Sequence, residues 1–361
     1  MDGHEIAQRR LAQQHLAGPP SADPVSVVRR LGCVQSQEYA VAKWSLGQRC
    51  APGVTDASVQ SLVDDGTILR THILRPTWHF VLGEELGWIQ AVTGPRVHVF
   101  NGYYNRMHGL SPDVAARTTS VITSALSGGN HLTRPELAAV LASAGLPATG
   151  NKLAYVVMFA ELEGLIANGV RRGKQHTYAL VAERVPAPIT LDPEAGLVEL
   201  TRRYFTSHGP ASIKDFAWWS SLTVTQIKRG IEGCGDALTS TVVDGRTLFF
   251  ASDGPEPAPP PAASLLQGYD EYVVAYTDTK FVYNVEGRAP TPGRYNENMM
   301  FHPITFDGQI GAFWRRTPTP KQITLEIDLF VEPTARQRKA LTEEVERYEA
   351  FAGLPVTVTF V

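Results

Sequence analysis

Residues 131–181 read HLTRPELAAVLASAGLPATGNKLAYVVMFAELEGLIANGVRRGKQHTYALV, and this stretch decides the fold. Thr133 can cap a helix, because a proline follows in the first turn and Glu136 holds the reciprocal capping-box position. This helix should end near Gly145. After LPATG, apolar side chains recur at helical spacing and predict a second helix over 151–168. The stretch therefore begins with two helices joined by a short turn.

A basic hairpin is predicted directly after these helices. Arg171, Arg172 and Lys174 crowd around a glycine, and a strand-like run follows at 177–181. Helix, short turn, helix and hairpin is the winged-helix arrangement, in which the second helix can enter a DNA groove and the wing can contact the backbone. The three basic side chains are therefore candidate phosphate contacts. Simple solvation is the alternative for each, and a winged helix can also serve as a packing or dimerisation module.

The same plan recurs downstream. Ser212 and Asp215 repeat the capping-box pair, which predicts another helix start. A second helix is predicted over 224–234, and an Asp-Gly turn then separates alternating strand-like residues within 237–252. These features predict a second wing.

More irregular patterns flank these two copies. A degenerate copy is expected near the N-terminus, with helices at 25–31 and 59–64 and strands within 69–82. The proline-rich DGPEPAPPPAA at 253–263 predicts an extended linker. Beyond it, one helix is expected at 333–350. Short strand-like runs surround that helix, at 272–276, 304–306, 310–314, 322–330 and 356–360.

Together these patterns predict an α+β fold of tandem winged-helix units with a C-terminal β-rich, barrel-like domain. The expected domains are a degenerate first winged-helix unit at 1–110, a second at 111–190, a third at 191–255 and the β-rich domain at 264–361. Several units in one chain hold several DNA-reading surfaces in a fixed relation, which suits wrapping around one duplex. We therefore expect a monomer.

The composition restricts the class of protein. With 43% hydrophobic and 19% charged residues over 361 positions, the usage is that of a globular chain with more than one domain. No run of about 18 uncharged apolar residues and no secretory signal is present, so we expect no membrane span and a cytoplasmic location. Three widely spaced cysteines match neither a disulfide framework nor a zinc knuckle. A net charge of -3 means that DNA contacts must come from local basic clusters, and Arg315 and Arg316 form one.

The segment LGCVQSQEYAVAKWSLGQR at 31–49 carries two glutamines, Gln35 and Gln37, close to an apolar helix end. Amide groups in such a place need hydrogen-bond partners. Taken alone, the more ordinary interpretation is that they brace backbone groups of the first unit. Glu38 is the neighbouring carboxylate and is kept in reserve as a general base.

The sequence resembles the AlkZ-like winged-helix DNA glycosylases, a family that excises bulky alkylated purines and can unhook interstrand crosslinks. The resemblance runs through VQSQEYAVAKWSLGQR at 34–49, RTHILRPTWHFV at 70–81, LLQGYDEYVVAY at 265–276 and DGQIGAFWRR at 307–316. It implies that Gln35 and Gln37 form the catalytic Gln-x-Gln signature of the family. Ser36 stands between them, where the family usually has an apolar residue.

The chemistry of the implied substrate agrees with two neutral amides. An N7- or N3-alkylated purine carries positive charge, so it is already a good leaving group and needs little general-acid help. What remains is to orient a water at the anomeric carbon of an oxocarbenium-like sugar. Two amides can hold a water in a fixed direction, although they cannot remove its proton as a carboxylate would. We expect a monofunctional DNA glycosylase without cofactor or metal, acting on alkylated purines in double-stranded DNA, in repair or in self-resistance to a genotoxin.

A non-enzymatic winged-helix transcription regulator is the alternative, in which Gln35 and Gln37 only brace the fold. A regulator prefers a sequence and leaves the duplex intact, whereas a glycosylase releases a base and leaves an alkali-labile abasic site. We expect the glycosylase to have an open cleft between tandem units, because crosslinked bases cannot be extruded into a deep pocket.

Two other residue pairs are weaker candidates. His72 and His79 lack a third ligand at metal spacing, so no metal site is expected. Asp270 and Glu271 are adjacent and would face opposite sides of a strand. Their spacing therefore does not make them an acid and base pair.

Overall fold

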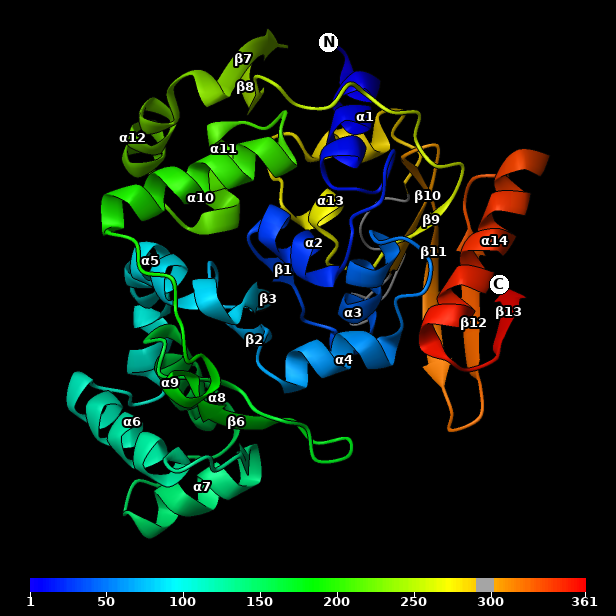
Figure 1. The fold of residues 1–361 in the computed structure, drawn as a ribbon. Helices are drawn as coiled ribbons and strands as arrows, with labels where there is room; N and C mark the ends of the chain where they lie inside the picture. Colours follow the sequence, from blue (N-terminus) through cyan, green and yellow to red (C-terminus); the bar gives the residue numbers. More distant parts are fainter. Residues whose placement is uncertain (290–301) are drawn as a thin grey trace.

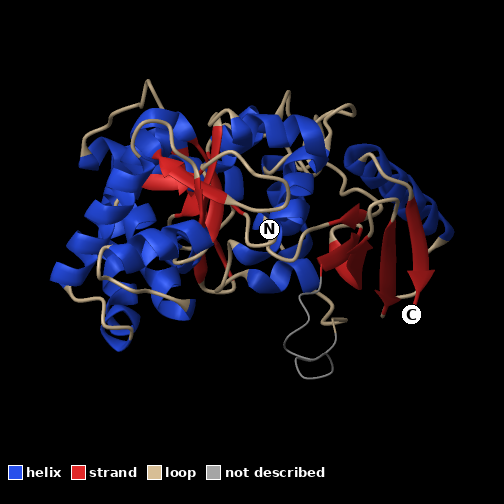
Figure 2. Cartoon of the chain, turned by 90° about the horizontal axis from the view of Figure 1, so that it is seen from below, coloured by secondary structure: helices blue, strands red, loops and turns tan. Residues whose placement is uncertain are grey.

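The computed structural model describes residues 1–289 and 302–361. Three successive parts of the chain share one order of elements: a helix, a short strand or bridge, two helices and two antiparallel strands. A larger sheet from the C-terminal part lies at one end of the molecule (Figure 1, Figure 2). An N-terminal helix, α1 (Gly3–Gln13), precedes the first part.

The first part contains the short sheet that carries Gln35. Its elements are α2 (Pro24–Leu31), β1 (Val34–Gln35), α3 (Tyr39–Gln48), α4 (Asp56–Asp64), β2 (Ile68–His72) and β3 (Trp78–Leu82). The strands are antiparallel in the order β1-β3-β2, with Gln35 opposite His79. A 3-10 turn, η1 (Gly83–Glu85), and the long helix α5 (Leu86–Met107) lead to the second part.

The second part confirms the capping-box prediction. Its elements are α6 (Pro112–Leu126), β4 (Leu132–Thr133), α7 (Arg134–Ser143), α8 (Gly150–Leu162), β5 (Ile166–Asn168) and β6 (Thr177–Leu180), with strand order β4-β6-β5. Thr133 caps α7 and exchanges hydrogen bonds with Glu136. The prediction that the next helix continues to residue 168 was wrong. Gly164 has a φ of 68°, and the chain returns as β5 against β6.

The third part repeats this order around the predicted turn. The short helix α9 (Val181–Arg184) leads to α10 (Pro193–His208), α11 (Ile213–Ser220), α12 (Val224–Cys234), η2 (Gly235–Ala237), β7 (Leu238–Val243) and β8 (Arg246–Ala251). Ala211 bridges to β8 and so occupies the place of a first strand. Ser212 and Asp215 form the predicted capping box. Asp244 and Gly245 both have positive φ, as a two-residue turn between twisted strands requires.

The C-terminal part forms an open sheet. Its strands are β9 (Ser264–Leu265), β10 (His302–Phe306), β11 (Gln309–Pro318), β12 (Ile323–Leu329) and β13 (Val356–Phe360), in the order β13-β12-β11-β10-β9. Helix α14 (Ala335–Ala352) connects the parallel strands β12 and β13. Within the described residues β9 and β13 are edge strands that do not pair with each other, so the predicted barrel-like closure is not found.

A helical turn replaces the strand predicted at 272–276. Asp270 accepts from the backbone N–H of Tyr272 and so caps α13 (Glu271–Val274), which the 3-10 turn η3 (Lys280–Asn284) follows. The alternation of Tyr and Val residues predicted a strand here. Capping by Asp270 and burial of Glu271 favour the helical turn instead.

The C-terminal sheet shares a hydrophobic core with the first part. Trp44 of α3 lies edge-to-face against Tyr348 and Phe351 of α14, with ring centroids 5.3 Å apart in each pair. Trp44 and Trp314 donate their indole N–H groups to backbone carbonyls at 265–266, at 2.8 and 2.9 Å. The chain beyond the predicted linker is therefore held directly against the first part.

Two chemical features of the chain bear on its class. No helix of the described residues combines the length and apolar character that a membrane span needs. The three cysteines are free, and Cys33 and Cys50 are buried. Burial raises the pKa of the Cys50 thiol to about 12, so this group is a core residue and not a nucleophile.

Candidate active site

Gln35 lies where three distant segments of the chain meet. Its backbone N–H donates to the Glu271 carboxylate at 2.8 Å, and its carbonyl accepts from the Gln267 amide at 3.0 Å. Its side-chain Oε1 accepts from Nη2 of Arg75, in the connection between β2 and β3, at 2.6 Å. Only 4% of Gln35 is exposed. These contacts hold the amide group in one orientation.

Gln37 is the more accessible member of the pair and is half-buried. Its Oε1 accepts from the backbone N–H of Trp78 on β3 at 3.4 Å, and its carbonyl accepts from Arg70 at 3.3 Å. Arg70 also donates through Nε and Nη2 to the Ser36 carbonyl, each at 3.0 Å. The β2–β3 hairpin thus contacts both side-chain oxygens, and each amide oxygen has a second lone pair with which it can accept from a water.

A buried carboxylate lies against the backbone of Gln35. Glu271 is fully buried, and besides Gln35 it accepts from Trp219 Nε1 at 2.9 Å and His208 Nε2 at 3.3 Å. Burial acts to raise the pKa of Glu271, but hydrogen bonds from His208 and from the Gln35 backbone help to outweigh it, and the pKa is lowered to about 2. Glu271 is therefore ionised with both oxygens engaged, so it positions Gln35 and is unsuited to remove a proton from water.

The adjacent carboxylate serves a different contact. Asp270 accepts from Arg49 at 2.7 and 3.0 Å in an ion pair whose two side chains are fully buried. Glu38, the reserve base, lies 3.1 Å from His302 Nε2. Glu38 and Asp270 thus have cationic or imidazole partners of their own, unlike the two neutral glutamine amides.

The two histidines of the hairpin are separately engaged. His72 Nδ1 lies 2.5 Å from the Glu161 carboxylate, and His79 Nδ1 lies 2.9 Å from the Thr77 carbonyl. Burial and the nearby Arg75 charge together lower the pKa of His79 to about 3. In the part of the chain that the structure describes, no three potential ligands gather as a metal site requires.

Two of the five predicted phosphate contacts line one cavity. Arg171 from the β5–β6 connection and Arg316 from β11 border a cavity of about 380 Å³, together with a lysine of α3. Arg172 and Arg315 are exposed and each forms an ion pair with a glutamate. Lys174 is exposed near the tip of the same connection. The five residues therefore divide between a cavity wall and the open surface.

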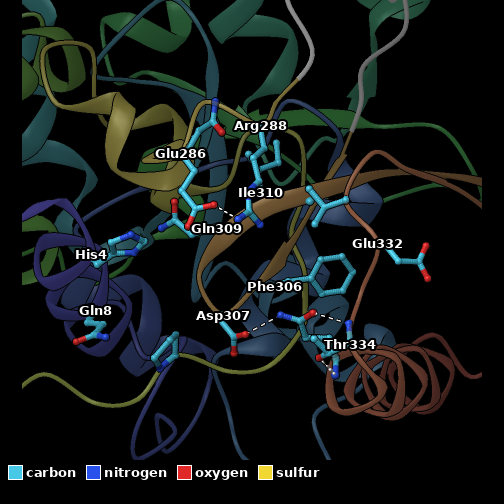
Figure 3. Close-up of a pocket in the computed structure, with 15 residues that line it drawn as sticks. His4, Gln8, Glu286, Arg288, Phe306, Asp307, Gln309, Ile310, Glu332 and Thr334 are labelled. Carbon is cyan, nitrogen blue, oxygen red and sulfur yellow. Dashed lines mark hydrogen bonds and ion pairs between the residues drawn. The ribbon is translucent and has the colours of Figure 1, made fainter.

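A second cavity, of about 400 Å³, lies between α1 and the C-terminal sheet (Figure 3). Its lining is acidic on balance, with Glu286, Asp307 and Glu332 against Arg288. Glu286 pairs with Arg288, and Asp307 accepts from Gln337 at 2.7 Å. Each of the three carboxylates forms an ion pair with an arginine, so this cavity has no excess of cations to bind a phosphate and is a poor candidate for contact with nucleic acid.

Sequence reasoning missed Arg75 and set Glu271 aside. They contact Gln35 from 40 and 236 positions away, a separation that no local pattern reports. One signal was present, because both residues lie within the stretches 70–81 and 265–276 that carry the family resemblance. Stretches that share a resemblance and meet in space are therefore the place to look for groups that support a site.

Comparisons with known proteins agree with this fold. The structure of "Streptomyces sahachiroi DNA glycosylase AlkZ" matches with a TM-score of 0.79 and 21% identity, over 99% of this chain and 100% of that chain. At this identity the likeness shows the fold. None of the curated proteins compared with the chain matches it significantly. A model of the family described as "DNA glycosylase AlkZ-like" matches residues 28–351.

These findings define the class of enzyme. The chain is a DNA glycosylase, an enzyme of DNA repair that acts on N-glycosyl bonds and has DNA as its substrate. Within that class it belongs to the AlkZ-like family. The alternative of a non-enzymatic regulator is therefore wrong.

Proposed function

We propose that this enzyme is a monofunctional glycosylase for bulky alkylated purines of the N7-alkylguanine type, including those in interstrand crosslinks. The observation that carries the proposal is the fixed amide of Gln35, held at Oε1 by Arg75 at 2.6 Å. The nearby carboxylates are engaged with other partners, so neutral amides face the substrate. Such a site suits a cationic base that departs readily and fails with an undamaged base, which needs protonation.

In the proposed mechanism Gln35 and Gln37 orient the attacking water. The alkylated purine leaves as a neutral base, and positive charge develops on the sugar. The ionised Glu271, 2.8 Å from the Gln35 backbone nitrogen, offsets the charge of Arg75. The Arg75 charge near the developing oxocarbenium ion is thereby compensated.

We also infer that the three repeated parts are winged-helix units, with boundaries at 1–110, 111–190 and 191–255, followed by the β-rich domain at 264–361. Their common order of elements supports this, as do the matching strand orders β1-β3-β2 and β4-β6-β5. Such units suit binding of double-stranded DNA by a monomer. Monomeric state, cytoplasmic location and a role in self-resistance to a genotoxin stay predictions.

Incubation with duplex DNA that carries a single N7-alkylguanine tests the function. We expect alkali-dependent strand breaks with the natural protein, a rate about 100-fold lower with Gln37→Ala, and spontaneous breakage alone with Gln35→Ala/Gln37→Ala. Undamaged duplex should stay intact.

Glu38→Gln is the matched control, because it removes the reserve base beside the pair. Its rate should stay within about threefold of the natural protein. If Glu38→Gln lost all activity while Gln35→Ala/Gln37→Ala stayed active, the role of base would belong to Glu38. Breaks in undamaged DNA would contradict lesion dependence.

A further inference from the structure

A cavity of about 380 Å³ lies beside the Gln-x-Gln segment, between distant parts of the chain. Its walls come from α3, α4, the β5–β6 connection, β11, β12 and α14. Lys43, Arg171 and Arg316 line it. Tyr39 also lines it, and Arg70, which donates to the Gln37 carbonyl at 3.3 Å, lies 5.5 Å from the Tyr39 ring, so the cavity is connected to the proposed catalytic pair through Arg70.

The charge in this cavity is not balanced. Among its described lining residues Asp56 is the one carboxylate, and it accepts from Lys43 Nζ at 2.7 Å. Arg171 and Arg316 form no ion pair with a described carboxylate. Arg171 donates instead to an amide oxygen at 3.5 Å and a backbone carbonyl at 3.3 Å. Two guanidinium groups without an ion pair to a described carboxylate therefore border the same space, and the nearest acidic contact of Arg171 is that of its backbone N–H with Asp64 at 3.4 Å.

Cations also converge on a single aromatic ring in this cavity. Lys43 Nζ lies 5.0 Å, Arg171 Cζ 5.3 Å and Arg70 Cζ 5.5 Å from the centroid of the Tyr39 ring. Burial and then these three cations lower the pKa of His176, another lining residue, to about 4. Like charges at this spacing repel one another, and a bound anion relieves that repulsion.

Two Arg-Arg dipeptides show the same division of roles. In 171–172, on the β5–β6 connection, Arg172 pairs with a glutamate of α7 and its side chain is 51% exposed. In 315–316, on β11, Arg315 pairs with a glutamate of β12 and its side chain is 50% exposed. The other arginine of each dipeptide is half-buried in the cavity wall without a carboxylate among the described residues. The arginines without a carboxylate partner and the cations that converge on Tyr39 both indicate a site for an anion.

We propose that this cavity binds one backbone phosphate of the DNA strand beside the excised base. The inference rests on the proposed function and adds the contact that fixes the strand relative to Gln37. A phosphodiester matches the donors, because its oxygens accept from guanidinium forks and an ammonium group. The first turn of α3 lines the cavity through Tyr39 and Ala40, and its N-cap Glu38 makes no side-chain capping bond.

The test compares two double variants that remove equal charge. Arg171→Ala/Arg316→Ala takes both guanidinium groups from the cavity, and Arg172→Ala/Arg315→Ala takes the outer arginine from the same two dipeptides. Each is titrated with duplex DNA containing a stable abasic analogue. We expect the cavity variant to bind about tenfold more weakly than the natural protein, and the outer variant to stay within about threefold.

Duplexes with one phosphate at a time replaced by a neutral methylphosphonate locate the contact. One position beside the analogue should weaken binding about tenfold in the natural protein and the outer variant, and should have no effect in the cavity variant. Arg171→Lys/Arg316→Lys keeps the charge and should recover part of the affinity, which separates lost contact from lost folding.

Equal losses in the two alanine variants, or unchanged methylphosphonate sensitivity in the cavity variant, would overturn the phosphate site. The proposed function fails in a different way. If the natural protein releases no alkylated base while the binding differences persist, the phosphate site stands and the assigned chemistry does not.

Discussion

The β2–β3 and β5–β6 connections occupy the same place in two sheets of equal strand order, yet they use arginine differently. In the first connection Arg75 is 8% exposed and donates to the side chain of Gln35. In the second, Arg172 and Lys174 are exposed and Arg171 lines a cavity. One topology therefore places the same residue type inside the protein in one unit and at a ligand-accessible surface in another.

Packing around each connection explains the difference. The first sheet lies between the C-terminal sheet and the third part, and its apolar side chains join a separate core cluster with each. Ile166 and Tyr178 of the second sheet pack within a cluster of their own part, Ala167 joins a cluster of the first sheet, and the hairpin extends away from its own core (Figure 1). A buried arginine must have fixed acceptors, so Arg75 organises the interior, whereas an exposed arginine can contact a ligand.

A substitution of Glu271, a buried partner of Gln35, should have the largest effect. In Glu271→Gln one oxygen becomes an NH2 group that faces other donors. We expect the free energy of unfolding, measured with urea, to fall by about 3 kcal/mol. Glu271 stabilises the fold above the pKa of its unfolded form, 4.5, and this contribution disappears as the pH falls towards about 2. The difference between the two proteins should therefore shrink over that range, and a difference independent of pH would contradict the assigned charge.

A substitution of Arg75 should separate the positioning of Gln35 from the binding of DNA. Arg75→Met removes the donor to Gln35, so we expect the single-turnover excision rate at saturating DNA to fall about 100-fold with little change in affinity. Arg172→Met makes the same replacement on the β5–β6 connection and should leave that rate within about threefold. Similar losses in both variants would remove the proposed contrast between the two connections.

The pH dependence of the free energy of unfolding should report on one histidine from each hairpin, His79 and His176. Burial lowers the pKa of His79 to about 3 and that of His176 to about 4, from 6.5. Below pH 6.5 the unfolded chain takes up a proton before the native chain does, so the free energy of unfolding falls by about 1.4 kcal/mol per pH unit for each group. His79→Asn should flatten this fall down to about pH 3 and His176→Asn down to about pH 4. An unchanged slope would mean that these histidines are protonated in the native state.

The smallest effect is expected at the tip of the exposed connection. Lys174→Ala should change the free energy of unfolding by less than about 0.5 kcal/mol, because the side chain is exposed. If Lys174 contacts a phosphate, the slope of log Kd against log salt concentration should decrease by about 0.9. A slope equal to that of the natural protein would show that the lysine is only solvated.

Local signals predicted much of the fold. Thr133 and Ser212 begin their helices as capping boxes indicate, and Asp244 with Gly245 forms the predicted turn. Each of these signals depends on residues within four positions. The segment at 272–276 was predicted wrongly because its alternation suits a strand, while burial of Glu271 among distant partners favours a helical turn.

The sequence by itself determined where helices and turns begin, the family to which the enzyme belongs, and the Gln-x-Gln pair as its candidate site. Only the tertiary structure decided which of many similar charged residues serve that pair. Arg75 and Arg171 are the same residue type on equivalent hairpins, and nothing adjacent to either distinguishes their roles. Their surroundings do, because the partners of Gln35 lie 40 and 236 positions away, and packing alone brings them within hydrogen-bond distance.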